Sequence, residues 1–222
     1  KFQMRSMSAL YTSGVQANLN SDLGTEYTLD LLQKFQLPEN DLFDLFDYCK
    51  TKHIIPLCTP WDLESLEKLN NYGVQAYKVA SADLTNHVLL KAITDTNRPV
   101  ICSTGMSTEE EIKLTIDLFK KQSSQFALLL CNSTYPTPFK DINLNYLQRL
   151  KQMGAMIIGY SGHERGINIP IAAVAKGAKI IEKHITLDRS MEGNDHKVSL
   201  LPNEFRTMVK SIRQVEDALG SS

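Results

Sequence analysis

Two histidines follow neighbouring apolar runs in this chain, and their imidazoles could hold a metal ion. His163 follows the run that begins at Met156, and His184 follows the next run, 21 residues further on. Two imidazoles alone make an open metal site, which suits catalysis because substrate oxygens or water complete the shell. A hydrogen-bonded structural role is the alternative for each histidine. Ser161 and Asp195 lie near them in sequence and favour a site, so both interpretations stay open.

Lys78 is a charged residue inside an otherwise apolar run, residues 76–80. Its stem could pack in the core while its ammonium group reaches water. Alternatively, its charge could hold a phosphate or carboxylate at the mouth of a barrel. Glu182 and His184 are two residues apart and share a strand face. If that face points inward, Glu182 needs a partner, for instance Lys78 or an arginine.

The small residues Ser103–Ser107 lie between an apolar run and a helical stretch. Backbone N–H groups of such a segment can approach an anion at the positive end of a helix. A plain turn with a serine cap is an equally good interpretation. Ser107 with Glu110 three residues later predicts a capping box.

The elements that must position these residues are apolar runs alternating with helical stretches. The predicted strands are centred near residues 57, 78, 101, 129, 157 and 181, with a spacing of 21 to 28 residues. Apolar periodicity and capping residues predict helices over residues 39–52, 62–73, 84–96, 107–122, 141–153, 167–176 and 202–219. Residues 4–30 read as a long loop with a short helix. Polar residues follow each run, and the carboxyl ends of parallel strands carry the chemistry of such folds.

This repeat predicts an α/β protein, a (β/α)8 TIM barrel that lacks its first βα unit and most of its second. Six complete βα units are visible, whereas a barrel needs eight, and Phe2 reads as the tail of an earlier strand. The missing units would lie before Lys1. We therefore expect an incomplete catalytic barrel over residues 1–219 and a boundary tail at residues 220–222.

Composition is ordinary for a soluble domain: 222 residues, a net charge of −1, 42% hydrophobic and 22% charged residues. This charge balance predicts no attraction to nucleic acid or membranes. No apolar stretch approaches the length of a bilayer span, and no secretory leader is visible. The four cysteines form no C-x-x-C pair, which argues against a zinc site or disulfide framework and favours a reducing compartment. Serine-hydrolase, dinucleotide-binding and P-loop signatures are also absent.

Seven ordered motifs resemble the sialic acid synthase family, which includes the N-acetylneuraminate, legionaminate and pseudaminate synthases and the spore-coat polysaccharide synthases. They are Lys1-Phe2-Gln3, Tyr77-Lys78-Val79-Ala80-Ser81, Ser103-Thr104-Gly105-Met106, Asn132-Ser133-Thr134-Tyr135-Pro136, Gly159-Tyr160-Ser161-Gly162-His163, residues 182–188 and residues 193–197. The resemblance covers essentially the whole chain.

The resemblance implies a cytoplasmic, homodimeric TIM-barrel transferase of carbohydrate biosynthesis. It condenses phosphoenolpyruvate, water and an N-acetylated mannose-type aldose into a nine-carbon 2-keto sugar acid and phosphate, with Mn²⁺ or Mg²⁺ as cofactor. The residues that match phosphate and carboxylate contacts are Lys1, Lys78, Ser81, Ser103, Ser133 and Ser161. His163 and His184 match the metal ligands. Gln3, Tyr135 and Asp195 match positions that face the amino sugar, and Lys78, Tyr135 and Asp195 become the candidate catalytic residues.

Some positions depart from the family pattern. Gly162 replaces the usual aspartate before the metal-binding histidine, Glu164 replaces the threonine after it, and Asp83 stands where many members have glutamate. A family glutamate motif would lie before Lys1, and an antifreeze-like domain would follow Leu219. Two other functions remain open from the residues: another metal-assisted TIM-barrel aldolase or hydrolase acting on a sugar phosphate, and a non-catalytic sugar-binding module.

Overall fold

The computed structural model describes residues 1–11 and 29–220, and the chain folds as two compact units. The first unit comprises residues 1–79 and 87–100, and the second comprises residues 80–86 and 101–222. Most of the predicted loop over residues 4–30 lies outside the described residues, as does the predicted boundary tail apart from Gly220.

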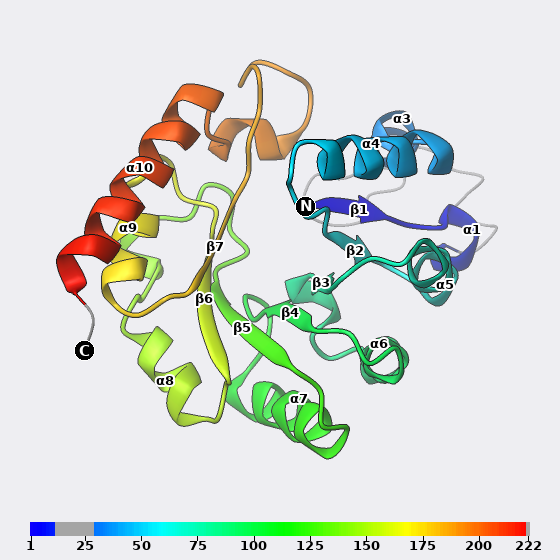
Figure 1. Cartoon of the computed structure of the whole chain (residues 1–222), viewed down its shortest axis with the longest axis horizontal. Coiled ribbons are helices and arrows are strands. Elements are labelled where there is room, and N and C mark those ends of the chain that lie inside the picture. The colour runs from blue at the N-terminus through cyan, green and yellow to red at the C-terminus, as the bar shows by residue number, and fades with distance from the viewer. Residues whose placement is uncertain (12–28, 221–222) are drawn as a thin grey trace. The chain divides into compact units, whose positions relative to one another are not determined.

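The first unit contains short parallel strands with helices between them (Figure 1). Strand β1 (Phe2–Met4) pairs with β2 (Cys58–Pro60), and β2 pairs with β3 (Tyr77–Val79). Its helices are α1 (Met7–Leu10), α3 (Leu29–Phe35), α4 (Glu39–Thr51), α5 (Leu63–Tyr72) and α6 (His87–Asp95). Because β1 pairs in register with β2, the prediction that Phe2 belongs to a strand is confirmed.

Helix α5 shows how local sequence sets the ends of these elements. The Asp62 carboxylate accepts a hydrogen bond from the backbone N–H of Ser65 at 2.8 Å and caps the helix. At the other end, Gly73 adopts a left-handed conformation with φ of 87°. Leu66 and Leu69 on the inner face are buried. The predicted bounds of this helix are therefore confirmed, whereas Leu63, the first of its three regularly spaced leucines, is exposed.

The second unit contains most of β4 (Val100–Ser103), followed by β5 (Phe126–Cys131), β6 (Ile157–Gly162) and β7 (Ile180–Lys183). Both β5–β6 and β6–β7 are parallel pairs. Its helices are α7 (Glu109–Lys121), α8 (Tyr146–Gln152), α9 (Asn168–Ala175) and α10 (Pro202–Leu219), with 3-10 turns η1 (Ser81–Asp83), η2 (Phe139–Asp141) and η3 (Asn194–Val198).

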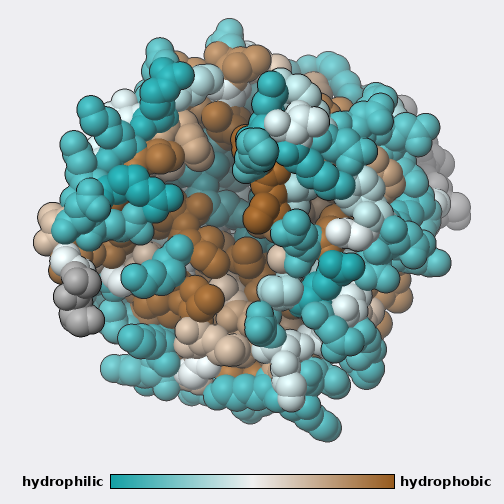
Figure 2. Space-filling view, viewed as in Figure 1, coloured by the Kyte–Doolittle hydropathy of each residue, from teal (hydrophilic) through white to brown (hydrophobic). Residues whose placement is uncertain are grey.

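Helices α9 and α10 lie side by side (Figure 1) and share one apolar cluster. Val174, Met208 and Ile212 form its buried part with Leu200, and Ile181 of β7 packs against it. Figure 2 shows apolar side chains gathered over the region of β5 and β6, with polar side chains over the outer helices. This packing covers β7 from one face.

Several helix starts differ from the sequence prediction. The cap of α7 is Thr108, whose hydroxyl accepts from the N–H of Glu111, while the Glu111 carboxylate accepts from the N–H of Thr108 at 2.7 Å. The predicted box of Ser107 with Glu110 is thus wrong by one residue. Helix α8 begins at Tyr146 rather than residue 141, because η2 and the left-handed Asn143 (φ of 52°) interrupt the chain first.

The α/β class, the parallel strands and the alternation with helices are confirmed. Closure into an eight-stranded barrel, with the first units before Lys1, stays a prediction.

Candidate active site

The imidazoles of His163 and His184 lie together beyond the ends of β6 and β7. Their ring centroids are 5.3 Å apart. Tyr135, from the loop after β5, stacks on His163 with a centroid distance of 4.0 Å and stands edge-on to His184 at 6.0 Å. Three loops that are distant in sequence therefore build one aromatic cluster, and Tyr135 is 40% exposed.

The hydrogen bonds of His163 define its tautomer. Its Nδ1 is 2.6 Å from the carbonyl oxygen of Asn132, which can only accept, so Nδ1 carries the proton. The Sγ of Cys131 also lies 3.8 Å from Nδ1. In a neutral ring Nε2 is then an acceptor, and the Tyr135 hydroxyl donates to it at 2.8 Å. The lone pair of Nε2 therefore points at the Tyr135 hydroxyl.

Burial lowers the pKa of the His163 imidazole from its usual 6.5 to about 4, and the nearby His184 adds to this effect. The hydrogen bond to Asn132 opposes the shift without reversing it. At neutral pH His163 is thus an uncharged base, which is the form that binds metals.

This depressed pKa makes a stability prediction for the metal-free protein. Between pH 6.5 and 4 the unfolded chain binds a proton at His163 that the folded chain does not, so stability falls as the pH falls. At pH 5 the penalty is about 2 kcal/mol. Urea unfolding at pH 7 and pH 5 should show a smaller loss in His163→Gln than in wild type, while His87→Gln, at an exposed site, should follow wild type. Equal losses in all three proteins would contradict the prediction.

Carboxylates flank the two imidazoles. His184 Nδ1 lies 3.5 Å from Oδ2 of Asp195, which belongs to η3. Across the β6–β7 pair, the Ser161 hydroxyl donates to Oε1 of Glu182 at 2.9 Å. Ser161 is thus one partner of Glu182.

The remaining predicted serines of this unit surround the turn after β4. The Ser81 hydroxyl accepts from the backbone N–H of Gly105 at 3.0 Å, and Ser103 is buried. A Cβ at Gly105 would meet the Ser133 hydroxyl at 2.8 Å, so only glycine fits there without movement. Ser81, Ser103 and Ser133 therefore all lie at or beside the turn after β4.

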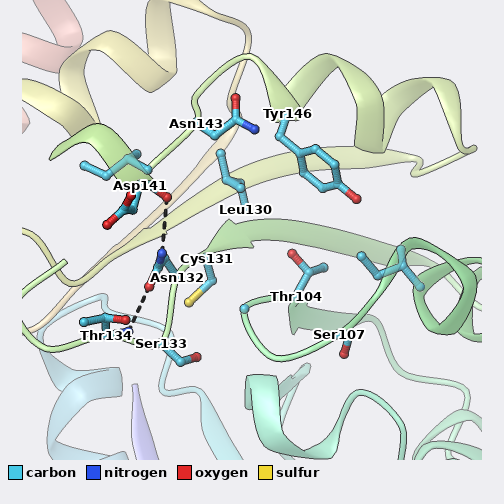
Figure 3. Close-up of a pocket in the computed structure, with 13 residues that line it drawn as sticks. Thr104, Ser107, Leu130, Cys131, Asn132, Ser133, Thr134, Asp141, Asn143 and Tyr146 are labelled. Carbon is cyan, nitrogen blue, oxygen red and sulfur yellow. Dashed lines mark hydrogen bonds between the residues drawn. The ribbon is translucent and has the colours of Figure 1, made fainter. Parts of the chain in front are cut away.

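A cavity of about 360 Å³ opens beside this turn (Figure 3). Thr104 and Ser107 line one side, while Asn143 and Tyr146 line the side opposite. Among the described lining residues the polar groups are hydroxyls, amides and the Asp141 carboxylate. Such a lining suits a ligand that carries hydroxyl and amide groups better than it suits an anion. Asn143 and Tyr146 were not predicted as site residues, because nothing in their local sequence marks them.

Three predicted residues belong to the first unit. Lys78 is 3% exposed and its ammonium group donates to the carbonyl of Val79 at 2.9 Å, so the alternative in which the head reaches water is wrong. Gln3 is exposed, and its Oε1 accepts from the indole of Trp61 at 3.0 Å. Lys1 is also exposed.

The donors of the second unit fit a divalent cation with an open shell. His163 shows the usual arrangement of a ligand histidine, with its far ring nitrogen held by a backbone carbonyl. Within the described part of the chain, no group of three or more His, Cys, Asp or Glu side chains has metal-binding geometry. A cation held by the two imidazoles would therefore need further ligands from water, substrate or other groups.

The fold and this cluster define a class of α/β proteins with polar sites at the ends of parallel strands. The chain belongs to the NeuB family, whose model matches residues 1–222. The N,N'-diacetyllegionaminic acid synthase of Campylobacter jejuni is 40% identical over 205 residues, covering 91% of this chain and 61% of the relative. Human N-acetylneuraminate-9-phosphate synthase is 38% identical over 179 residues, covering 80% and 50%.

Solved structures agree. The N-acetylneuraminic acid synthetase of Leptospira borgpetersenii matches with a TM-score of 0.84 and 38% identity, over 87% of this chain and 68% of that one. The resemblance to sialic acid synthases is therefore confirmed. The chain spans 50–61% of the length of these curated relatives. No described helix is long and apolar enough to cross a membrane.

Proposed function

We propose that this chain carries a catalytic part of a phosphoenolpyruvate-dependent sialic-acid-type synthase. The reaction joins phosphoenolpyruvate, an N-acetylated mannose-type aldose and water to give a nine-carbon 2-keto sugar acid and phosphate. The observation that carries the proposal is the family match over residues 1–222 together with the cluster of Tyr135, His163, His184 and Asp195.

The chemistry has a balanced course. C3 of phosphoenolpyruvate attacks the aldehyde carbon, a C–C bond forms, and the aldehyde oxygen takes up a proton. C2 becomes electron-poor and is captured by water, which loses a proton. The tetrahedral centre at C2 then breaks its bond to the phosphate oxygen and becomes the keto group. The protein must hold the two reactants in register, exclude stray water and support the developing charges.

We assign His163 and His184 to a divalent cation, Mn²⁺ or Mg²⁺, which supplies Lewis acidity at the aldehyde oxygen when bound. Asn132 keeps the proton on Nδ1 of His163, so that Nε2 could exchange its hydrogen bond from the Tyr135 hydroxyl for the cation. Tyr135 shields the buried ring of His163 and presents its hydroxyl at the same place. Asp195 lies beside His184 and could take a hydrogen bond from the sugar.

We assign Lys78, Ser81, Ser103, Ser133 and Ser161 to the phosphate and carboxylate of phosphoenolpyruvate, with Lys1 as a further cation. Gln3 is assigned to the amino sugar. The support for these roles is the match to the family motifs, together with the buried charge of Lys78 and the convergence of three serines on the turn after β4.

The experiment that tests the function is phosphate release from phosphoenolpyruvate, measured with the full natural protein, a divalent metal and a panel of N-acetylated mannose-type sugars. Sugar-dependent release and a 2-keto acid product are expected. A protein that cleaves sugar phosphates without consuming phosphoenolpyruvate would be an aldolase or hydrolase instead. Sugar binding without turnover would indicate a binding module.

Lys78 allows a prediction that separates phosphoenolpyruvate binding from metal binding. Lys78→Ala should raise the KM for phosphoenolpyruvate roughly tenfold to more than a hundredfold, because a charge-assisted hydrogen bond contributes about 1.5–3 kcal/mol. Metal affinity should stay nearly unchanged. Lys78→Met keeps the apolar stem and should behave alike, whereas Lys91→Ala, at an exposed ion pair of the same unit, should resemble wild type. An unchanged KM in Lys78→Ala would leave Lys78 a purely structural residue.

A further inference from the structure

The two residues of a buried ion pair are the sequence neighbours of His163 and His184. The ammonium group of Lys183 is 2.8 Å from Oε1 of Glu164, and both side chains are fully buried. Lys183 also donates to the backbone carbonyl of Glu164, and the Tyr160 hydroxyl donates to Oε2 at 2.6 Å. Glu164 directly follows His163, and Lys183 directly precedes His184. The pair therefore joins the same two loops that carry the imidazoles.

The pair and the imidazoles occupy opposite faces of the sheet. Ser161 lies opposite Glu182 in the β6–β7 register, and Gly162 lies opposite Lys183. Because side chains alternate along a strand, Lys183 points away from the face that carries Glu182. The hydrogen bond from Tyr160 to Glu164 places Glu164 on the side of Tyr160 rather than of Ser161.

Gly162 leaves the room that this pair needs. A Cβ at Gly162 would lie 2.5 Å from Oε2 of Glu164 and 2.6 Å from Cε1 of Tyr160. Any side chain there would push the carboxylate away from Lys183. Gly162 and Glu164 are therefore parts of one arrangement.

Burying two charged side chains costs desolvation free energy. A buried ion pair can often be replaced by apolar residues without loss of stability, so stability alone does not account for it. Two of its hydrogen bonds, both donated by Lys183, instead tie the segment after β6 to the end of β7, and the third holds the Glu164 carboxylate against Tyr160 of β6.

We propose that Glu164 and Lys183, with Gly162 leaving them space, are positioning residues that fix the spacing and orientation of His163 and His184. Only the identity of what the two imidazoles bind rests on the proposed function. The positions themselves can be measured in metal-free protein, without any assay of activity.

The test records ring nitrogen resonances of the histidines by NMR in metal-free protein. Glu164→Gln keeps the size of the side chain and removes its charge, while Gly162→Ala keeps the charge and displaces the carboxylate. Both should shift the ring resonances of His163 and His184 and leave those of His53 and His87 unchanged. Glu67→Gln, on the exposed face of α5, should change none of them.

A titration with Mn²⁺ as the probe follows on the same variants. Loss of a group that orients a ligand typically weakens metal binding roughly 10- to 100-fold. If Glu164→Gln fails to fold, Glu164→Asp, which keeps the charge and shortens the reach, supplies the same measurement. Unchanged His163 and His184 resonances in a folded but less stable variant would overturn the proposal and leave the pair purely structural. A third outcome separates the two proposals. If the His163 and His184 resonances shift in the variants but wild-type protein does not bind Mn²⁺, the positioning role is supported and the metal assignment is rejected.

Discussion

His184→Ala is expected to lose metal affinity and turnover together, by more than roughly 100-fold in kcat/KM. The reason is the small number of protein ligands. The ring centroids of the two imidazoles are 5.3 Å apart with the rings tilted by 49°, and the described residues bring no group of three or more ligating side chains together. Removing one imidazole therefore removes one of the two proposed ligands.

The measurement combines a metal titration with steady-state kinetics on the full natural protein. His87→Ala is the matched control, because His87 is exposed at the start of α6 and far in sequence from the cluster. Normal metal-dependent turnover in His184→Ala would show that the metal centre is wrongly assigned and that His184 has a structural role. Rescue by high metal concentration would distinguish lost binding from lost folding.

The second large effect is expected at the buried ion pair. Lys183→Met should destabilise the protein by about 3–5 kcal/mol, because it leaves the Glu164 carboxylate buried without its countercharge. Burial already lowers the pKa of Lys183, while the attraction to Glu164 opposes that shift. The countercharge of Glu164 therefore favours the charged form of Lys183.

Replacing both partners, as in Glu164→Leu with Lys183→Met, should recover most of this loss, since no lone charge then remains. Recovery stays incomplete because the hydroxyl of Tyr160 loses its acceptor. Urea unfolding of the two single variants and the double variant yields the coupling energy. The exposed pair of Arg149 and Glu109 should show far weaker coupling. Additive losses at Glu164 and Lys183 would contradict the prediction.

The amino-acid sequence by itself determined most of the secondary structure. Alternating apolar runs predicted the strands, because residues buried on both faces of a parallel sheet leave a continuous apolar signal. Helix ends were predictable where capping is local: Asp62 and Gly73 bound α5, and Pro202 begins α10 as predicted. The helix starts at α7 and α8 were missed, because neighbouring residues compete for the cap and a left-handed Asn143 leaves no clear sequence signal.

The family, too, was evident from sequence, because its motifs keep order and spacing over the whole chain. The chemical candidates among the histidines and serines followed from their place after apolar runs. The distances between these side chains could not be predicted in this way. The approach of His163, His184 and Tyr135 depends on three loops whose separation in sequence carries no information about distance.

Only the tertiary structure decided the details that govern reactivity. The proton on Nδ1 of His163 is set by the carbonyl of Asn132, a backbone group that every residue type possesses. The charge of Glu164 is matched by Lys183, 19 residues away, and the space for both depends on the missing side chain of Gly162. Such contacts are long-range and depend on packing to fractions of an ångström, whereas sequence periodicity reports only which face of an element is buried.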